Sequence, residues 1–153
     1  MTKEKKKFWR DKWFYFVLIV GLGGPLLIGY VAYKGMESSS RINDTKRIHA
    51  QTVKYISAEI QKCKSGENKF MSNNQDCPAT AVKAINGAVA TMTDKNPFDA
   101  AKLSIRLSSS NINDEDVGYV SLSASGSDII IKTCIKTPCR KEENRKQSTV
   151  SIE

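Results

Sequence analysis

Four cysteines are the residues whose chemistry is most readily interpreted in this chain. All of them follow residue 60 of the 153: Cys63, Cys77, Cys134 and Cys139. An even number of cysteines in a small exported domain is typical of a disulfide framework. Three pairings are possible, and pairing between sequence neighbours gives Cys63–Cys77 and Cys134–Cys139. No Cys-x-x-Cys motif is present, so neither a redox dithiol nor a structural zinc site is expected.

The sequence contains few residues that could form a catalytic site. His49 is the single histidine, which leaves no second imidazole for Cys-His or Ser-His-Asp catalysis. It falls in a segment with helical periodicity, where a surface or interface position is expected. We therefore predict a non-enzymatic protein without a cofactor.

One acidic segment has the composition of a cation site. Its candidate oxygen ligands are Asn111, Asn113, Asp114 and Asp116. Calcium takes six to eight oxygen ligands, of which this segment would supply several. The EF-hand pattern fails, because Val117 occupies the place of the turn glycine. An acidic hairpin loop without a metal is the favoured interpretation.

The net charge of +8 is concentrated at two places. Residues 1–13 hold six basic and two acidic side chains, and residues 132–146 again hold six and two. Such patches can contact nucleic acid or lipid. Because neither patch carries a recognisable nucleic-acid motif, we interpret the first as a topology signal and the second as a solvated hairpin end.

A long uncharged stretch follows the basic N-terminus. Phe14–Tyr33 is long enough to cross the hydrocarbon core of a bilayer as a helix, and aromatic residues lie near both of its ends. A cleaved signal peptide is the alternative, but its apolar region would be shorter. The sequence predicts a single-pass inner-membrane protein with residues 1–13 in the cytoplasm and the C-terminal domain in the periplasm or at the cell surface.

Gly23, Gly24 and Pro25 lie in the middle of that stretch. Proline lacks a backbone donor and clashes with the preceding turn, so a kink is expected. The small glycines would also let a neighbouring helix approach closely. A simple kink and a helix-packing site both remain open.

The remaining elements predict an α+β fold. Residues 34–40 are expected to form a polar hinge, and residues 41–153 an extracytoplasmic domain. Its first element is a helix over Arg41–Lys62, in which apolar residues recur at three- and four-residue steps: Ile42, Ala50, Val53, Ile56 and Ile60. A second helix is expected over Pro78–Met92. Further on the period changes to that of strands, at Leu103–Leu107, Val117–Ala124, Ile129–Ile135 and Thr149–Ile152.

This order of elements, closed by the cysteines near the C-terminus, resembles that of a type IV pilin. The similar segments are Arg41–Cys63, Asn96–Asp99, Val117–Leu122 and Ile129–Cys134 with Cys139. The resemblance implies a long helix packed on a small antiparallel sheet head. It also implies a structural role in a pilus or pilin-like envelope or secretion assembly, with other pilin-like subunits and the lipid bilayer as partners. Packing would use the glycine-proline segment together with Ile42, Val53, Ile56 and Ile60.

The N-terminus departs from the pilin pattern. A pilin precursor has a basic leader that ends in glycine, followed by a glutamate near the start of the apolar helix. Here no glycine precedes Phe8 or Phe14, and Phe14–Tyr33 contains no glutamate. This difference favours an alternative hypothesis, a membrane-anchored periplasmic interaction domain that does not polymerise.

Overall fold

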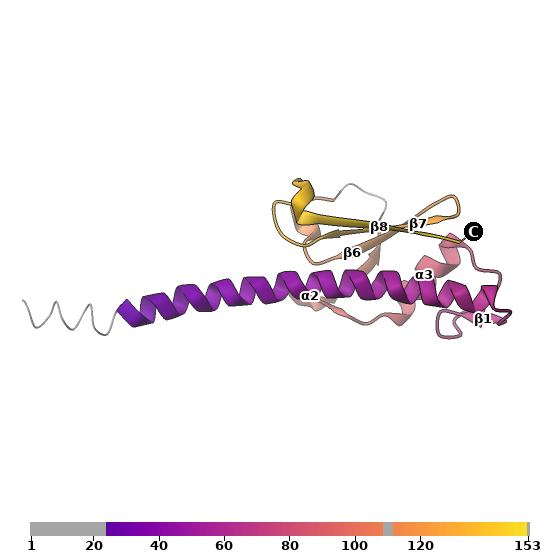
Figure 1. Cartoon of the computed structure of the whole chain (residues 1–153), viewed down its shortest axis with the longest axis horizontal. Coiled ribbons are helices and arrows are strands. Elements are labelled where there is room, and N and C mark those ends of the chain that lie inside the picture. The colour runs from indigo at the N-terminus through magenta and orange to yellow at the C-terminus, as the bar shows by residue number, and fades with distance from the viewer. Residues whose placement is uncertain (1–23, 109–111, 153) are drawn as a thin grey trace, which may run out of the picture. The chain divides into compact units, whose positions relative to one another are not determined.

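The computed structural model describes the backbone of residues 24–108 and 112–152, and within these ranges the side chains from residue 36 onward (Figure 1). The chain divides into two compact units, residues 1–39 and 40–153. The elements, in chain order, are α2 (Gly24–Lys64), β1 (Lys69–Phe70), β2 (Gln75–Asp76), α3 (Ala81–Thr91), β3 (Lys95–Asn96), β4 (Asp99–Leu103), β5 (Ile105–Leu107), the 3-10 helix η2 (Asp114–Asp116), β6 (Val120–Ser125), β7 (Asp128–Cys134), the 3-10 helix η3 (Glu142–Asn144) and β8 (Arg145–Ser151). The predicted α+β class is confirmed.

A four-stranded sheet with the order β5-β6-β7-β8 forms the centre of the second unit. β6, β7 and β8 are antiparallel neighbours, whereas β5 pairs with β6 in parallel. The prediction of a purely antiparallel sheet is therefore wrong at this edge. A parallel pair needs a connection of about a dozen residues, and the segment that contains η2 provides it here. Two further pairs, β1-β2 and β3-β4, are short hairpins outside this sheet.

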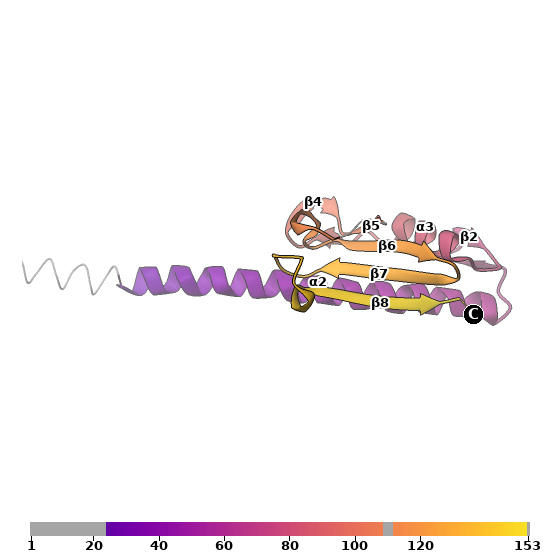
Figure 2. The same cartoon turned by 90° about the horizontal axis from the view of Figure 1, so that it is seen from above.

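One face of α2 packs against this sheet. The part of the helix within the second unit lies against one face of the sheet and runs along β6, β7 and β8 (Figures 1 and 2). Its buried positions recur at three- and four-residue steps: Thr45, Ile48, His49, Thr52, Ile56, Glu59 and Ile60. They meet buried side chains of the facing strands, Ile105, Val120, Leu122, Ile129, Ile131 and Val150. The core is therefore the contact between one helix face and one sheet face.

The predicted second helix is confirmed as α3. Thr80 caps its N-terminus by accepting a hydrogen bond from the backbone N–H of Lys83 at 3.3 Å. Its alanines and Ile85 join the same core. A Cβ atom at Gly87 would lie 2.6 Å from Cβ of Met71, so α3 and the preceding loop approach each other too closely for a side chain there.

The loop between α2 and α3 is fixed at several points. The Cys63–Cys77 disulfide closes it, and Glu59 on α2 accepts a hydrogen bond from the backbone N–H of Ser72 at 3.1 Å. Tyr55 hydrogen-bonds both Ser72 in the loop and Thr91 on α3. These contacts hold three consecutive residues in the left-handed region: Met71, Ser72 and Asn73, with φ of 52°, 52° and 68°. Such a backbone is costly for residues other than glycine and persists where its surroundings fix it.

The prediction of a membrane-spanning helix, and with it the single-pass location in the inner membrane, requires correction. Among the described residues, no helix is both long and apolar enough to cross a bilayer. From Lys34 onward α2 contains charged residues and three consecutive serines, Ser38–Ser40, which interrupt the apolar character that a span needs. Residues 14–23 of the segment on which the prediction rested lie outside the described residues, as do the side chains of residues 24–33.

The backbone of the predicted hinge at residues 34–40 is helical as part of α2, and the boundary between the two compact units falls within it. Serine lowers helix propensity only slightly, and no proline follows Pro25 within this helix. Gly24 and Pro25 are the first described residues of α2, and Gly23 lies outside the described residues. The kink predicted at these three residues stays a prediction.

Substitution of Ile56 tests the helix–sheet core. Ile56 is 0% exposed, and Ile56→Ala should lower the free energy of unfolding by about 2–5 kcal/mol through lost burial and a residual cavity. Val82→Ala is the matched control, since Val82 on α3 is 57% exposed and its loss should cost about 0.5 kcal/mol or less. Urea unfolding followed by circular dichroism measures both. Equal effects would contradict this description of the core.

Candidate functional site

His49 connects α2 to two strands. Its Nδ1 lies 2.9 Å from the hydroxyl of Thr133 on β7, and its Nε2 lies 2.9 Å from the hydroxyl of Ser148 on β8. His49 is 4% exposed and lies in the contact between α2 and the sheet of its own domain, so of the two predicted positions, surface or interface, the surface position is wrong. Both hydroxyls can donate or accept, and a neutral imidazole therefore satisfies both contacts with either tautomer.

Two buried threonines complete this polar row on α2. Thr45 donates a hydrogen bond to the carbonyl of Arg41, and Thr52 donates one to the carbonyl of Ile48, each at 2.8 Å. A hydroxyl that bonds the helix's own backbone needs no partner on the sheet. The helix can therefore bury Thr45 and Thr52 without leaving a polar group unpaired.

The environment of His49 disfavours its charged form. Burial, and to a smaller degree the positive charge of Lys146, lower the pKa of His49 below its ordinary value of 6.5. The unfolded chain therefore binds a proton in a pH range where the folded chain does not. The stabilisation from His49 is complete above pH 6.5 and is lost as the pH falls from there towards the lowered pKa of the folded state.

We expect His49→Gln to reduce the pH dependence of stability. The wild-type midpoint in urea should fall between pH 7.5 and pH 5 by more than that of the variant, because glutamine does not titrate in that range. Carboxylates contribute equally to both proteins, so the difference between the two profiles isolates the imidazole. Parallel profiles would show that His49 has the same pKa in the folded and unfolded chain.

The acidic segment uses its oxygens within the protein. Asp114 accepts a hydrogen bond from the backbone N–H of Cys139 at 2.6 Å. Asp116 accepts one from the backbone N–H of Asn113, and Asn113 accepts one from Glu115, so that η2 begins with a reciprocal cap. These oxygens therefore position the loop closed by Cys134 and Cys139. Asn111, the remaining candidate ligand, lies outside the described residues.

Arg106 on β5 connects the same segment to the sheet. Its guanidinium forms an ion pair with Asp116 and lies over the ring of Tyr119, 4.0 Å from the centroid. Both partners follow β5 in the chain, within the connection that leads to β6. In residues 24–108 and 112–152, no group of three or more histidine, cysteine, aspartate or glutamate side chains is placed to hold a metal ion.

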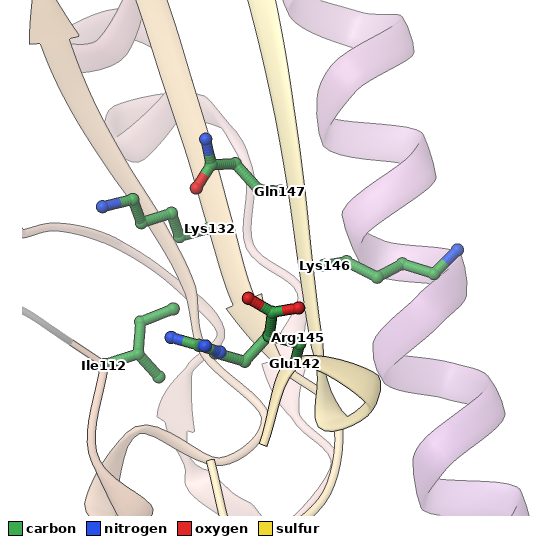
Figure 3. Close-up of a pocket in the computed structure, with 6 residues that line it drawn as sticks. All are labelled: Ile112, Lys132, Glu142, Arg145, Lys146 and Gln147. Atoms are coloured by element: carbon green, nitrogen blue, oxygen red, sulfur yellow. The ribbon is translucent and has the colours of Figure 1, made fainter. Parts of the chain in front are cut away.

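Basic side chains surround two hollows at β8. The smaller, of about 270 Å³, is drawn in Figure 3, where Lys132 of β7, Arg145 of β8 and Glu142 of η3 come from neighbouring elements. In that view Lys146 extends to the opposite side of β8, towards α2. The larger hollow, of about 620 Å³, is a groove between α2 and β8. It is lined by His49, Ala50, Val53, Lys54, Arg145, Lys146, Gln147 and Ser148.

The structure shows where the described residues of the predicted sites lie. The two disulfides join the sequence neighbours, Cys63 with Cys77 and Cys134 with Cys139. Ile56 and Ile60 are buried in the chain's own core, Val53 packs against it, and Ile42 is half-buried. The basic groove was missed, because its lining comes from segments about a hundred residues apart. The spacing of the buried residues from Thr45 to Ile60 could have identified the buried face of α2. This would have required counting the polar residues among them as buried.

Comparisons with known proteins give no match. No protein-family model, no curated protein and no solved structure matches this chain.

Proposed function

We propose that the chain is a non-enzymatic structural subunit of a type IV pilus or of a pilin-like secretion assembly, and that it packs against other subunits through the N-terminal part of α2. The order of the elements supports this role. A long helix is followed by a disulfide-closed loop, a short helix, a sheet and a second disulfide-closed loop near the C-terminus. The use of both nitrogens of His49 in helix–sheet contacts supports a structural role for this residue.

The observation that carries the proposal is a stretch of α2 without buried side chains. The side chains of α2 are described from Met36 onward, and the first buried one is Thr45. None of the side chains from Met36 to Asp44 is buried, and Met36 is 73% exposed. A helix stretch whose side chains stay partly or fully exposed is suited to ridge-into-groove packing with a helix of another subunit. Ile56 and Ile60 would not take part, since the core already uses them.

A second candidate is an interaction domain that does not polymerise. The sequence favours it at the N-terminus, where no glycine precedes Phe8 or Phe14 and Phe14–Tyr33 lacks glutamate. In this case the helix and sheet would present a surface to one partner rather than build a filament. The two candidates predict different results when cells are sheared. A filament subunit is released with the filaments, whereas a domain that does not polymerise is not.

Shearing of intact cells that produce the chain tests the proposal. Mass spectrometry should detect the wild-type chain in the sheared fraction. Met36→Asp should lower that recovery at least tenfold, because a charge in a helix–helix contact costs more than the roughly 1.4 kcal/mol that a tenfold change requires.

The matched control is Val82→Asp, which places the same charge at an exposed apolar position on α3. Its recovery in the sheared fraction should equal that of the wild type. If the wild-type chain is recovered only with the cells, the filament role is wrong and the interaction domain remains. If both variants behave alike, packing does not use the exposed part of α2 around Met36.

A further inference from the structure

β8 is an open edge of the sheet. It pairs with β7 on one side, and within residues 24–108 and 112–152 no strand pairs with its other side. Its register places Asp128 opposite Ser151 and Cys134 opposite Arg145. Ile152 donates to the carbonyl of Ser127, and Ile135 donates to that of Asn144, which fixes which residues of β8 bond inward. In an antiparallel pair the alternate residues point their N–H and C=O groups outward, and here these are Gln147, Thr149 and Ser151.

The outward backbone groups are accessible. The side chains of Gln147, Thr149 and Ser151 are exposed, and within the described residues no hydrogen bond takes up the N–H of any of the three. The other edge of the sheet, β5, has three residues, whereas β8 has seven. β8 is therefore the edge that offers the longer template for an added strand.

The groove beside this edge is positively charged. Lys54 comes from α2, Arg145 and Lys146 come from β8, and no carboxylate is among the described residues that line the groove. None of the three forms an ion pair with another described residue. Among the described residues that line the adjoining hollow, Glu142 is the one acidic side chain, and Lys132 and Arg145 lie with it (Figure 3). A ligand along β8 would therefore meet an excess of positive charge on both sides of the strand.

We propose that β8 binds an extended acidic segment of a partner protein as an additional strand of the sheet. Backbone hydrogen bonds to Gln147, Thr149 and Ser151 would supply affinity, and the lysines and arginine beside them would select carboxylates. This inference goes beyond the packing of α2 and does not rest on it. The alternative role for charges at an edge is to keep it unpaired, and the experiment distinguishes the two.

The probe is a short fluorescent peptide of alternating glutamate and valine, titrated into the purified full chain. Valine favours the extended backbone, and the alternation places every glutamate on one face. We expect saturable binding that weakens as salt is added. A counterpart N-methylated at alternate residues lacks the donors that the edge requires, and it should bind at least tenfold more weakly.

Two variants locate the site. Thr149→Pro removes an outward N–H without removing a bond to β7, a change that edge strands tolerate. Lys146→Glu reverses a charge in the groove. Each should weaken binding at least tenfold, whereas Lys95→Glu, at an exposed lysine on β3, should leave it unchanged. Circular dichroism checks that each variant folds, and the N-methylated peptide tests the backbone contact without any variant.

Three outcomes would overturn the proposal. Absence of binding to the wild-type chain would mean that the charges only protect the edge. Equal binding of the N-methylated peptide would exclude strand addition. A single-stranded oligonucleotide that binds as tightly as the peptide, and loses affinity on Lys146→Glu but not on Thr149→Pro, would identify a nucleic-acid surface instead.

Discussion

The contact between the polar row of α2 and the sheet is the constraint on which the rest of the second unit depends. A helix face of Thr45, His49 and Thr52 can be buried only if every polar atom has a partner. The helix supplies carbonyls for the two threonines, and β7 and β8 supply hydroxyls for the imidazole. The hydrogen bonds of His49 also have directions, so they set the position of the helix along the sheet more sharply than apolar packing would.

The other features follow from this docking. With α2 held in place, Glu59 and Tyr55 lie where they can bind the loop that Cys63 and Cys77 close. α3 then fills the core beside α2, and Gly87 permits its close approach to Met71. At the other end, Asp114 and Asp116 join η2 to the C-terminal disulfide loop and to Arg106. The docking also places Lys54 of α2 beside the edge of β8, which creates the basic groove.

Local patterns predicted some of the elements, whereas contacts between residues distant in sequence could not be predicted from them. The periods of Pro78–Met92 and Ile129–Ile135 indicated α3 and β7, because propensity and alternation are local properties. His49 was misplaced because its burial depends on Thr133 and Ser148, which lie far along the chain. The carboxylates of Asp114 and Asp116 resembled a cation site partly for the same reason, since Asp114 binds the distant backbone N–H of Cys139 and Asp116 pairs with Arg106 on β5. The parallel pairing of β5 with β6 also could not be predicted. It depends on the path of the connection between the two strands, and amino-acid composition does not reveal that path.

Native-state hydrogen exchange tests most directly whether α2 and the sheet form one cooperative unit. The account predicts that amides from Thr45 to Ile60 and those of the β7 core exchange at the same slow rate. It also predicts that both rates rise together as denaturant is added, because undocking α2 would leave buried polar and apolar groups without partners. Fast exchange of the α2 amides beside a protected β7 would contradict it, since the helix would then open without unfolding the sheet.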